Sequence, residues 1–296
     1  MKKNYVLLTA AKNEEEYIGL AIESILRQSV HPSAWYIMDD GSTDRTAEIV
    51  ASYAEEHSFI KLHSAGDGSS RNFGSQYKAI EAAFALARQK DFDFVGVQDA
   101  DIAPEPANYY EELLERFATS PKLGIAGGYI YERENGVFKA RKGNAIDSVA
   151  GGVQMFRREC FEEIGGYKPL TLGGSDWLAQ IEARMAGWEV EACPEFPIHH
   201  YRPTSSAGGR FQGLFKLGKL DGSFALHPLF EVFKCARRVT EKPLLIGSVV
   251  RFSGYLWWKL TRRESVIPPE AVRMSREEQM KKIKLALGLQ RGAAAR

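Results

Sequence analysis

Two aspartates separated by one small residue, Asp99 and Asp101, follow a short apolar run that is typical of a buried strand. Buried carboxylates destabilise a fold unless a cation or hydrogen-bond donors compensate them. A divalent cation that holds a diphosphate is one such partner, because Mg²⁺ and Mn²⁺ accept carboxylate oxygens as ligands. A solvated turn at a strand end is the alternative, since Asp is common in turns. The pair alone does not decide between them.

Three further polar groups follow the same pattern. Asp39 and Asp40 end another predicted strand, and Asp176 follows a glycine pair. His199 and His200 follow two prolines, Pro194 and Pro197. Carboxylates and histidines are the side chains that most often move protons or bind metals. For each of them a turn, a helix cap or a core position is the alternative.

The surrounding elements alternate between strand and helix. This order predicts an α/β fold with a mostly parallel sheet that helices cover on both faces. Ligands of such sheets bind at the carboxyl ends of the strands, where the acidic groups lie. Strands are predicted at 5–9, 35–38, 59–63, 94–98, 151–157 and 188–192, and helices after Asn13, which would form a capping box with Glu16, and at 47–54, 76–89 and 176–186. The histidines are expected in a loop that Pro194 and Pro197 bracket.

Composition narrows the class of protein. The 296 residues carry a net charge of +1, which argues against a nucleic-acid binder. The three cysteines are widely spaced and form neither a metal motif nor a disulfide framework, so a reducing cytoplasmic setting is expected. The first apolar run is too short for a signal sequence.

The ordered motifs resemble the glycosyltransferases of family 2, which have the GT-A fold and use nucleotide-diphosphate sugars. The supporting segments are Lys12-Asn13-Glu14-Glu15, Ser24-Ile25-Leu26-Arg27-Gln28, Ile37-Met38-Asp39-Asp40-Gly41-Ser42-Thr43-Asp44, the DxD element Asp99-Ala100-Asp101, Gly165-Gly166-Tyr167 and Gly174-Ser175-Asp176-Trp177. The resemblance covers about the first 200 residues. It implies an inverting, metal-dependent transferase that acts on a glycan or lipid-linked acceptor in bacterial cell-surface polysaccharide biosynthesis.

The resemblance also assigns roles on the donor side. Mn²⁺ or Mg²⁺ would be the cofactor, and its ligands would be Asp99, Asp101 and one of His199 and His200. The nucleotide sugar would contact Thr9, Ala10, Glu14, Asp39, Asp40, Arg71, Asp99 and Ala100. Arg71, in a Gly/Ser-rich loop, would pair with phosphate, and the alternative is a solvated loop arginine.

On the acceptor side, the resemblance makes Asp176 the general base. Relatives often carry two acids at this place, whereas this chain has Ser175 before Asp176, so a like charge that would raise the pKa is missing. Gly151, Gly152 and Trp177 would line the acceptor site. A tight turn for the glycines and a core position for the tryptophan are the alternatives.

The segment 234–263 is basic, with Glu241 as its one acid, and it contains an apolar stretch with Arg251 in the middle. One helical face would carry Leu245, Val249, Phe252, Leu256 and Leu260. We therefore expect an interfacial amphipathic helix on an anionic membrane surface. Packing on the catalytic domain or in a homodimer is the alternative.

The expected organisation is a catalytic domain at 1–225, with a nucleotide-binding half at about 1–103 and an acceptor-binding half at about 104–225, then a helical extension at 226–285 and a disordered tail at 286–296. Peripheral attachment to the inner face of the cytoplasmic membrane is expected. The competing functions are a non-catalytic glycan- or membrane-binding partner and a sugar-phosphate nucleotidyltransferase. The latter requires a Gly-rich phosphate loop after the first strand, where this chain has Ala10-Ala11-Lys12-Asn13-Glu14.

Overall fold

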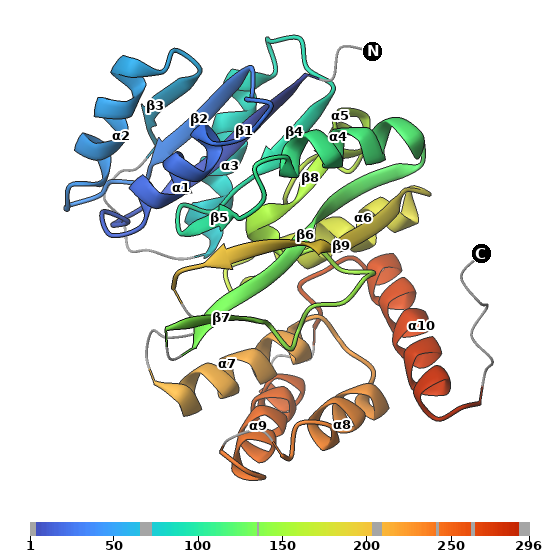
Figure 1. Ribbon diagram of the computed structural model, residues 1–296. Coiled ribbons are helices and arrows are strands. Elements are labelled where there is room, and N and C mark those ends of the chain that lie inside the picture. Colours follow the sequence, from blue (N-terminus) through green and yellow to red (C-terminus); the bar gives the residue numbers. More distant parts are fainter. Residues whose placement is uncertain are drawn as a thin grey trace. The chain divides into compact units, whose positions relative to one another are not determined.

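The computed structural model describes residues 4–65, 73–134, 136–202, 209–240, 243–261 and 264–289 (Figure 1). The chain divides into two compact units, Met1–Pro203 and Thr204–Arg296. The first is an α/β unit and the second is helical. The expected Arg71 site lies outside the described residues, as does most of the expected disordered tail.

The first four strands form the parallel half of the sheet. They are β1 (Tyr5–Ala11), β2 (Ala34–Asp39), β3 (Ile60–Ser64) and β4 (Phe94–Val97), in the order β3-β2-β1-β4. β1 is buried along nearly its whole length, as expected for a strand with helices on both faces of its sheet. These strands were predicted from their apolar runs, and their parallel order is confirmed.

The second half of the sheet is mixed. It continues from β4 through β8 (Met155–Arg157), β6 (Leu123–Glu134), β9 (Glu189–His200) and β5 (Ile102–Pro104), and β7 (Val137–Ala140) pairs with β6. β8 is antiparallel to both β4 and β6, and β9 is parallel to β6. The long strands β6 and β9 therefore extend the sheet beyond its four parallel strands.

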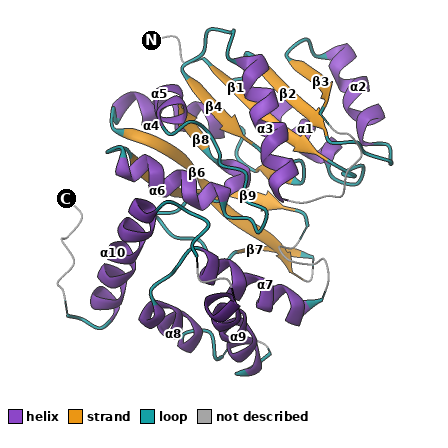
Figure 2. Cartoon of the chain, turned by 180° about the vertical axis from the view of Figure 1, so that it is seen from behind, coloured by secondary structure: helices purple, strands orange, loops and turns teal. Residues whose placement is uncertain are grey.

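Helices cover both faces of this sheet. They are α1 (Ile18–Leu26), α2 (Thr46–Glu56), α3 (Phe73–Ala87), α4 (Tyr109–Thr119), α5 (Arg158–Glu163) and α6 (Ser175–Met185). Figures 1 and 2, which view the chain from opposite sides, show α1 and α4 over one face and α3 and α6 over the other. This arrangement leaves the carboxyl ends of β1, β2 and β4 for ligands.

Three sequence predictions were wrong in detail. Asn13 does not cap a helix with Glu16: α1 begins at Ile18, and Asn13 has a φ of 54° and accepts a hydrogen bond from the Thr43 amide at 2.8 Å. The Asn13 side chain thus joins two loops, because the αL conformation that Asn tolerates turns the chain away from helix.

The predicted strand 151–157 is instead a short 3₁₀ helix, η1 (Gly151–Val153), followed by β8. The histidines are not in a loop, because β9 runs through both prolines to His200. Pro194 lies where the β6–β9 register shifts, and a bulge of this kind tolerates a residue without an amide hydrogen.

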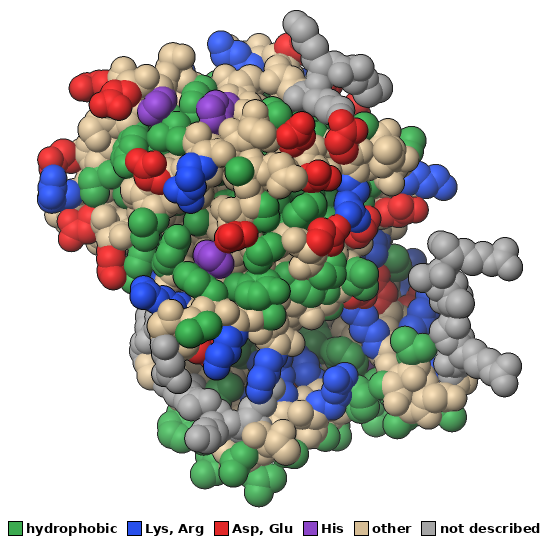
Figure 3. Space-filling view, viewed as in Figure 1, with side chains coloured by type: hydrophobic (Ala, Val, Ile, Leu, Met, Phe, Trp, Pro, Cys, Tyr) green, Lys and Arg blue, Asp and Glu red, His purple; other side chains and the backbone are tan. Residues whose placement is uncertain are grey.

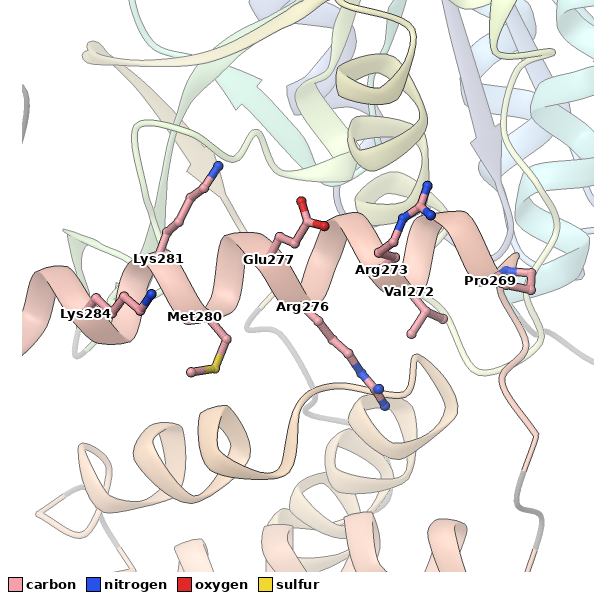
Figure 4. A pocket seen from close by; sticks show the side chains of 8 residues that line it. All are labelled: Pro269, Val272, Arg273, Arg276, Glu277, Met280, Lys281 and Lys284. Atoms are coloured by element: carbon pink, nitrogen blue, oxygen red, sulfur yellow. The ribbon is translucent and has the colours of Figure 1, made fainter. Parts of the chain in front are cut away.

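The second unit consists of α7 (Arg210–Ser223), α8 (Pro228–Ala236), α9 (Ile246–Thr261) and α10 (Pro269–Ala286). No described helix is both long enough and apolar enough to span a bilayer. α7 belongs to this unit. The expected boundary at about residue 225, between a catalytic domain and a helical extension, stays a prediction about function. In α10, the Arg276 Nε donates to the Ala225 carbonyl at 2.8 Å, and Figure 4 shows Arg276 pointing away from Arg273 and Lys281.

Glycines bring α7 and α9 into backbone contact. A Cβ on Gly218 would lie 1.9 Å from the Arg251 carbonyl oxygen, and one on Gly254 would lie 2.3 Å from the Phe215 carbonyl oxygen. These distances are far below van der Waals contact, so the two helices pack this closely only because glycine has no side chain.

Gly254→Ala should therefore separate α7 from α9 and destabilise the second unit by about 1–3 kcal/mol, the usual cost of overpacking. Gly247→Ala, in the same helix, is the matched control, because its Cβ would lie 3.4 Å or more from its neighbours. Hydrogen exchange of α7 and α9 peptides measures the effect locally. Equal protection in the two variants would contradict the tight packing of these helices.

Candidate active site

The acidic groups gather at the carboxyl ends of the parallel strands. β2 ends at Asp39, and β4 leads directly into Gln98 and the aspartate pair. The backbone continues the register beyond the strands, because the Asp40 amide donates to the Ala11 carbonyl at 2.8 Å and the Gln98 amide donates to Leu8 at 3.0 Å. Local strand geometry thus brings segments 60 residues apart to one edge of the sheet.

Near the carboxyl end of β1, Thr9 has its side chain in the core. Its hydroxyl donates to the Gln98 carbonyl at 2.7 Å and accepts from the Trp35 indole at 2.9 Å. Asp39 is half-buried and accepts from the Ser42 amide at 3.2 Å, while buried Asp40 lies 3.8 Å from the Lys12 ammonium. Asp39 thus has the more exposed carboxylate of the two. Ala10 is half-buried at the end of β1.

Glu14 is buried, and Arg202 pairs with it. The Arg202 Nη1 lies 3.0 Å from Glu14 Oε1 and its Nη2 bonds Oε2, so the pair is bidentate. The Arg202 guanidinium also lies 5.3 Å from the Tyr17 ring centre and 4.0 Å from an Asp101 oxygen. Arg202 is therefore a cation held between two carboxylates of the site, and such planar forks also bind phosphate.

Asp101 is the outer carboxylate of the aspartate pair, and His200 lies beside it. β5 pairs with β9 so that Ile102 lies opposite His200, and the His200 Nε2 comes within 3.5 Å of Asp101 Oδ2. Burial lowers the pKa of His200, but the Asp101 hydrogen bond and charge outweigh it, so the pKa is raised above its usual value. Protonated His200 would thus offset part of the negative charge here.

His199 points to the other face of β9, as alternation along a strand requires. Its ring stacks on Phe138 with centres 3.9 Å apart, and burial lowers its pKa. The structure therefore brings His200, and not His199, to the acidic pair.

Asp99 is the inner carboxylate. Its Oδ1 accepts from the Gln76 amide at 2.9 Å, and its backbone amide donates to Gly152 at 3.0 Å. Burial, together with the Asp101 carboxylate, raises the pKa of Asp99 to about 7, although His200 opposes the shift. Ala100, between the aspartates, is buried.

Gly151 and Gly152 separate Asp99 from Asp176. A Cβ on Gly152 would lie 2.5 Å from an Asp99 carboxylate oxygen, and one on Gly151 would lie 2.8 Å from the Asp176 Cβ. The two glycines thus let two carboxylates press against adjacent peptide units of η1. They also form the tight turn that was the alternative interpretation.

Asp176 is half-buried in the first turn of α6. Burial raises its pKa, while backbone amides of Trp177, Asp176 and Gly151 oppose the shift. Ser175, where relatives often have an acid, is fully buried and accepts from the Leu170 amide at 3.3 Å. Trp177 is half-buried beside the aspartate.

Within the part of the chain that the structure describes, no group of three or more His, Cys, Asp and Glu side chains is arranged to hold a metal ion. Asp101 and His200, whose side chains lie 3.5 Å apart, are a pair of candidate ligands at this edge of the sheet. A metal here would need further oxygen ligands from its substrate or from water.

The family model "Glycosyl transferase family 2" matches residues 7–174, more than half of the chain. The chain belongs to glycosyltransferase family 2. The match spans β1, the Asp39–Asp40 end of β2, the aspartate pair and the Gly151–Gly152 turn, and it ends just before Asp176. The predicted family and GT-A class are thereby confirmed.

Two curated relatives are similar in sequence. The β-monoglucosyldiacylglycerol synthase of a Synechocystis strain is 27% identical over 224 residues, which cover 68% of this chain and 44% of the relative. The O-antigen chain rhamnosyltransferase WbaN of Salmonella anatum is 25% identical over 216 residues, 65% of this chain and 64% of the relative. The chain thus spans less than two thirds of each.

Among solved structures, the mannosyltransferase PcManGT of Pyrobaculum calidifontis, in complex with GDP-Man and Mn²⁺, superimposes with a TM-score of 0.56. It is 15% identical, and the alignment covers 97% of this chain and 81% of that chain. At this identity the likeness shows the shared fold.

Sequence reasoning missed two residues of this family 2 site, Arg202 and Gln76. Gln76 lies in the first turns of a helix far from the acids in sequence, so no local pattern singles it out. Arg202 had a signal, since it comes two residues after the histidines in the run His199-His200-Tyr201-Arg202.

The glycine turn generates a prediction. Gly152→Ala should push Asp99 aside, because the new Cβ would also lie 2.6 Å from the Ile102 Cδ1. We expect unfolding to become easier by about 1–3 kcal/mol and nucleotide affinity to fall at least about tenfold. Thermal unfolding and titration with nucleoside diphosphates measure these changes.

Gly143→Ala is the control, because its nearest neighbour would be the Arg141 Nε at 3.8 Å. If Gly152→Ala behaved like the control in both assays, Asp99 would not depend on the close approach of this turn.

Proposed function

We propose that the protein is an inverting, metal-dependent glycosyltransferase. It would move a sugar from a nucleotide-diphosphate donor to a glycan or lipid-linked acceptor in cell-surface polysaccharide biosynthesis. The observation that carries this proposal is the placement of two carboxylates on adjacent glycines, Asp99 against Gly152 and Asp176 against Gly151. The donor side and the acceptor side of the reaction would meet at this turn.

On the donor side, the nucleotide would lie over the ends of β1 and β2. Backbone at Thr9 and Ala10, with Glu14, would line the nucleoside pocket, and the Asp39 carboxylate would accept from the base. Asp39 is better suited than Asp40, because Asp40 is buried beside Lys12. Arg202 would bind the diphosphate, since its guanidinium already lies between Glu14 and Asp101.

The residues present fit a divalent cation. Asp101 supplies a carboxylate oxygen and His200 an imidazole nitrogen, a donor set that suits Mn²⁺ well, and diphosphate oxygens would complete it. Asp99, which Gln76 already binds, would orient the donor from the inner side. His199 would take no part, because it stacks on Phe138. When bound, the metal would supply Lewis-acid stabilisation of the leaving diphosphate.

On the acceptor side, Asp176 would act as general base. The acceptor oxygen would form a bond to the anomeric carbon as the bond from that carbon to the diphosphate breaks, and the acceptor proton would pass to the Asp176 carboxylate. A single displacement of this kind inverts the anomeric configuration. Trp177 and the Gly151–Gly152 backbone would hold the acceptor.

The relatives support this choice of substrates. Two of them are a β-monoglucosyldiacylglycerol synthase and an O-antigen chain rhamnosyltransferase, names that indicate a glycolipid and a glycan as products. The structural neighbour binds a nucleotide sugar with Mn²⁺. The presence of Asp99, Asp101 and Asp176 disfavours a non-catalytic role. The loop after β1 contains no glycine, which disfavours a nucleotidyltransferase.

We further propose that residues 1–103 bind the nucleotide and that the residues from 104 to about 225 bind the acceptor. The described residues hold three buried cysteines, all free, which suits a reducing compartment. The proposed location of the protein is therefore the cytoplasmic face of a membrane.

Asp176→Asn tests the base. It should lower transfer at least about a thousandfold while nucleotide affinity stays unchanged, because an amide cannot take the acceptor proton. Asp91→Asn, which removes the same charge at an exposed site, is the control. Transfer at the wild-type rate would remove Asp176 as base.

The pH profile checks the same group. Burial raises the pKa of Asp176 above that of an ordinary aspartate, and the base must be ionised to accept a proton. Transfer should therefore decline, as the pH falls, at a higher pH than an ordinary aspartate would give. A rate that stays flat down to the ordinary range would speak against this role.

The adjacent histidines form a matched pair for the metal. His200→Gln should weaken the Mn²⁺-dependent gain in melting temperature with a nucleoside diphosphate, because it removes the nitrogen beside Asp101. His199→Gln, one residue away on the opposite face, should leave that gain intact. The assignment fails if the two variants lose it equally.

A further inference from the structure

Helix α9 buries an arginine and leaves several of its large apolar residues exposed. Its buried positions are Gly247, Arg251, Gly254 and Tyr255. Its exposed positions are Ile246, Val249, Ser253, Leu256, Trp257, Leu260 and Thr261. Five of these seven are large and apolar, and they recur at helical spacing, so they form one stripe along the helix. A helix of a water-soluble protein normally has the reverse arrangement.

A buried ion-pair network accounts for the polar interior. The Arg251 Nη2 lies 2.7 Å from Asp221 Oδ2, and the Lys234 ammonium lies 2.7 Å from Asp221 Oδ1 and 3.0 Å from Glu231 Oε2. Two cations thus match two carboxylates among α7, α8 and α9. Each is costly to bury alone, so the network holds the orientation of α9 and keeps its apolar stripe outward.

Neighbouring segments of the same unit, α8 and the residues just before α9, also expose large apolar side chains, and we call the whole set the apolar face. It comprises Leu229, Val232, Leu244, Leu245, Ile246, Val249, Leu256, Trp257 and Leu260. Leu245, Val249 and Leu260 are each more than 60% exposed. In Figure 3, hydrophobic side chains gather in the lower part of the view, where Figure 1 shows α9. Exposed apolar surface of this extent marks an interaction site.

The charge of the unit indicates its partner. Residues 204–296 contain 18 Lys and Arg against 7 Asp and Glu, a net charge of +11, whereas residues 1–203 contain 21 against 31, a net charge of −10. The near-neutral total therefore hides a strongly basic helical unit. A strongly basic unit that exposes apolar side chains, Trp257 among them, has the two features that binding to anionic lipid requires.

We propose that the apolar face inserts into the interface of an anionic lipid bilayer, with α9 parallel to the membrane and Trp257 at headgroup depth. A second copy of the chain is the less suitable occupant, because two faces in contact would bring two units of charge +11 together. The docking does not depend on the proposed function. The further idea that the membrane presents the sugar acceptor does rest on it.

The test mixes the full chain with two kinds of vesicle in the absence of a nucleotide sugar. One kind contains phosphatidylcholine alone, and the other contains phosphatidylcholine and phosphatidylglycerol in equal amounts. We expect cosedimentation with the anionic vesicles. Val249→Asp with Leu260→Asp should reduce it at least about tenfold, because both aspartates would enter the apolar interface. Leu20→Asp with Leu86→Asp, at exposed positions of α1 and α3, adds the same charge and should bind as the wild type does.

The depth is measured by quenching of Trp257 with brominated phospholipids, and Trp257→Phe identifies its share of the signal. Circular dichroism and the nucleotide-induced thermal shift report whether the variants are folded, so failure of docking is distinguishable from failure of the proposed transfer. Equal binding of both double variants would overturn the proposal. Failure to bind any vesicle, with a lipid-free dimer that Val249→Asp and Leu260→Asp dissociate, would overturn it in favour of self-association.

Discussion

Repulsion among buried carboxylates is the constraint on which this structure depends. Glu14, Asp99 and Asp101 lie at the ends of neighbouring strands, and their charges interact because water is largely excluded. The fold compensates them with Arg202, which bridges two of them, and with His200, whose pKa is raised by the carboxylates it faces. A site that keeps unsatisfied negative charge is also a site that attracts a cation.

The cations come from one strand. β9 ends at His200, and Arg202 follows two residues later, so the pairing of β9 with β5 affects how well the acids are neutralised. A shift of this register by one residue would bring His199 to the acids and leave its neighbour against Phe138. The mixed half of the sheet therefore completes the chemistry of the parallel half.

Much of this arrangement was predictable from local patterns. The apolar runs that end in Asp39 and Asp99 predicted parallel strands with acids at their carboxyl ends, and the ordered motifs predicted family 2. The contribution of Gln76 was not predictable, because it depends on where α3 packs. Neither was the choice between the two histidines, since a strand through Pro194 and Pro197 runs against the usual propensities. In the second unit, periodicity separated the faces of α9, but only the partners of Arg251 show which face is inside.

The two glycines of η1 have a consequence for how such an enzyme diversifies. Adjacent Cα atoms are about 3.8 Å apart whatever the side chains, so the spacing between the contacts of Asp99 and Asp176 is set by the main chain itself. Substitution cannot adjust this distance gradually, and only an insertion or deletion would change it. On the proposed function, new sugar preferences would then arise in the walls around the turn, while the turn itself would hold the two carboxylates in place.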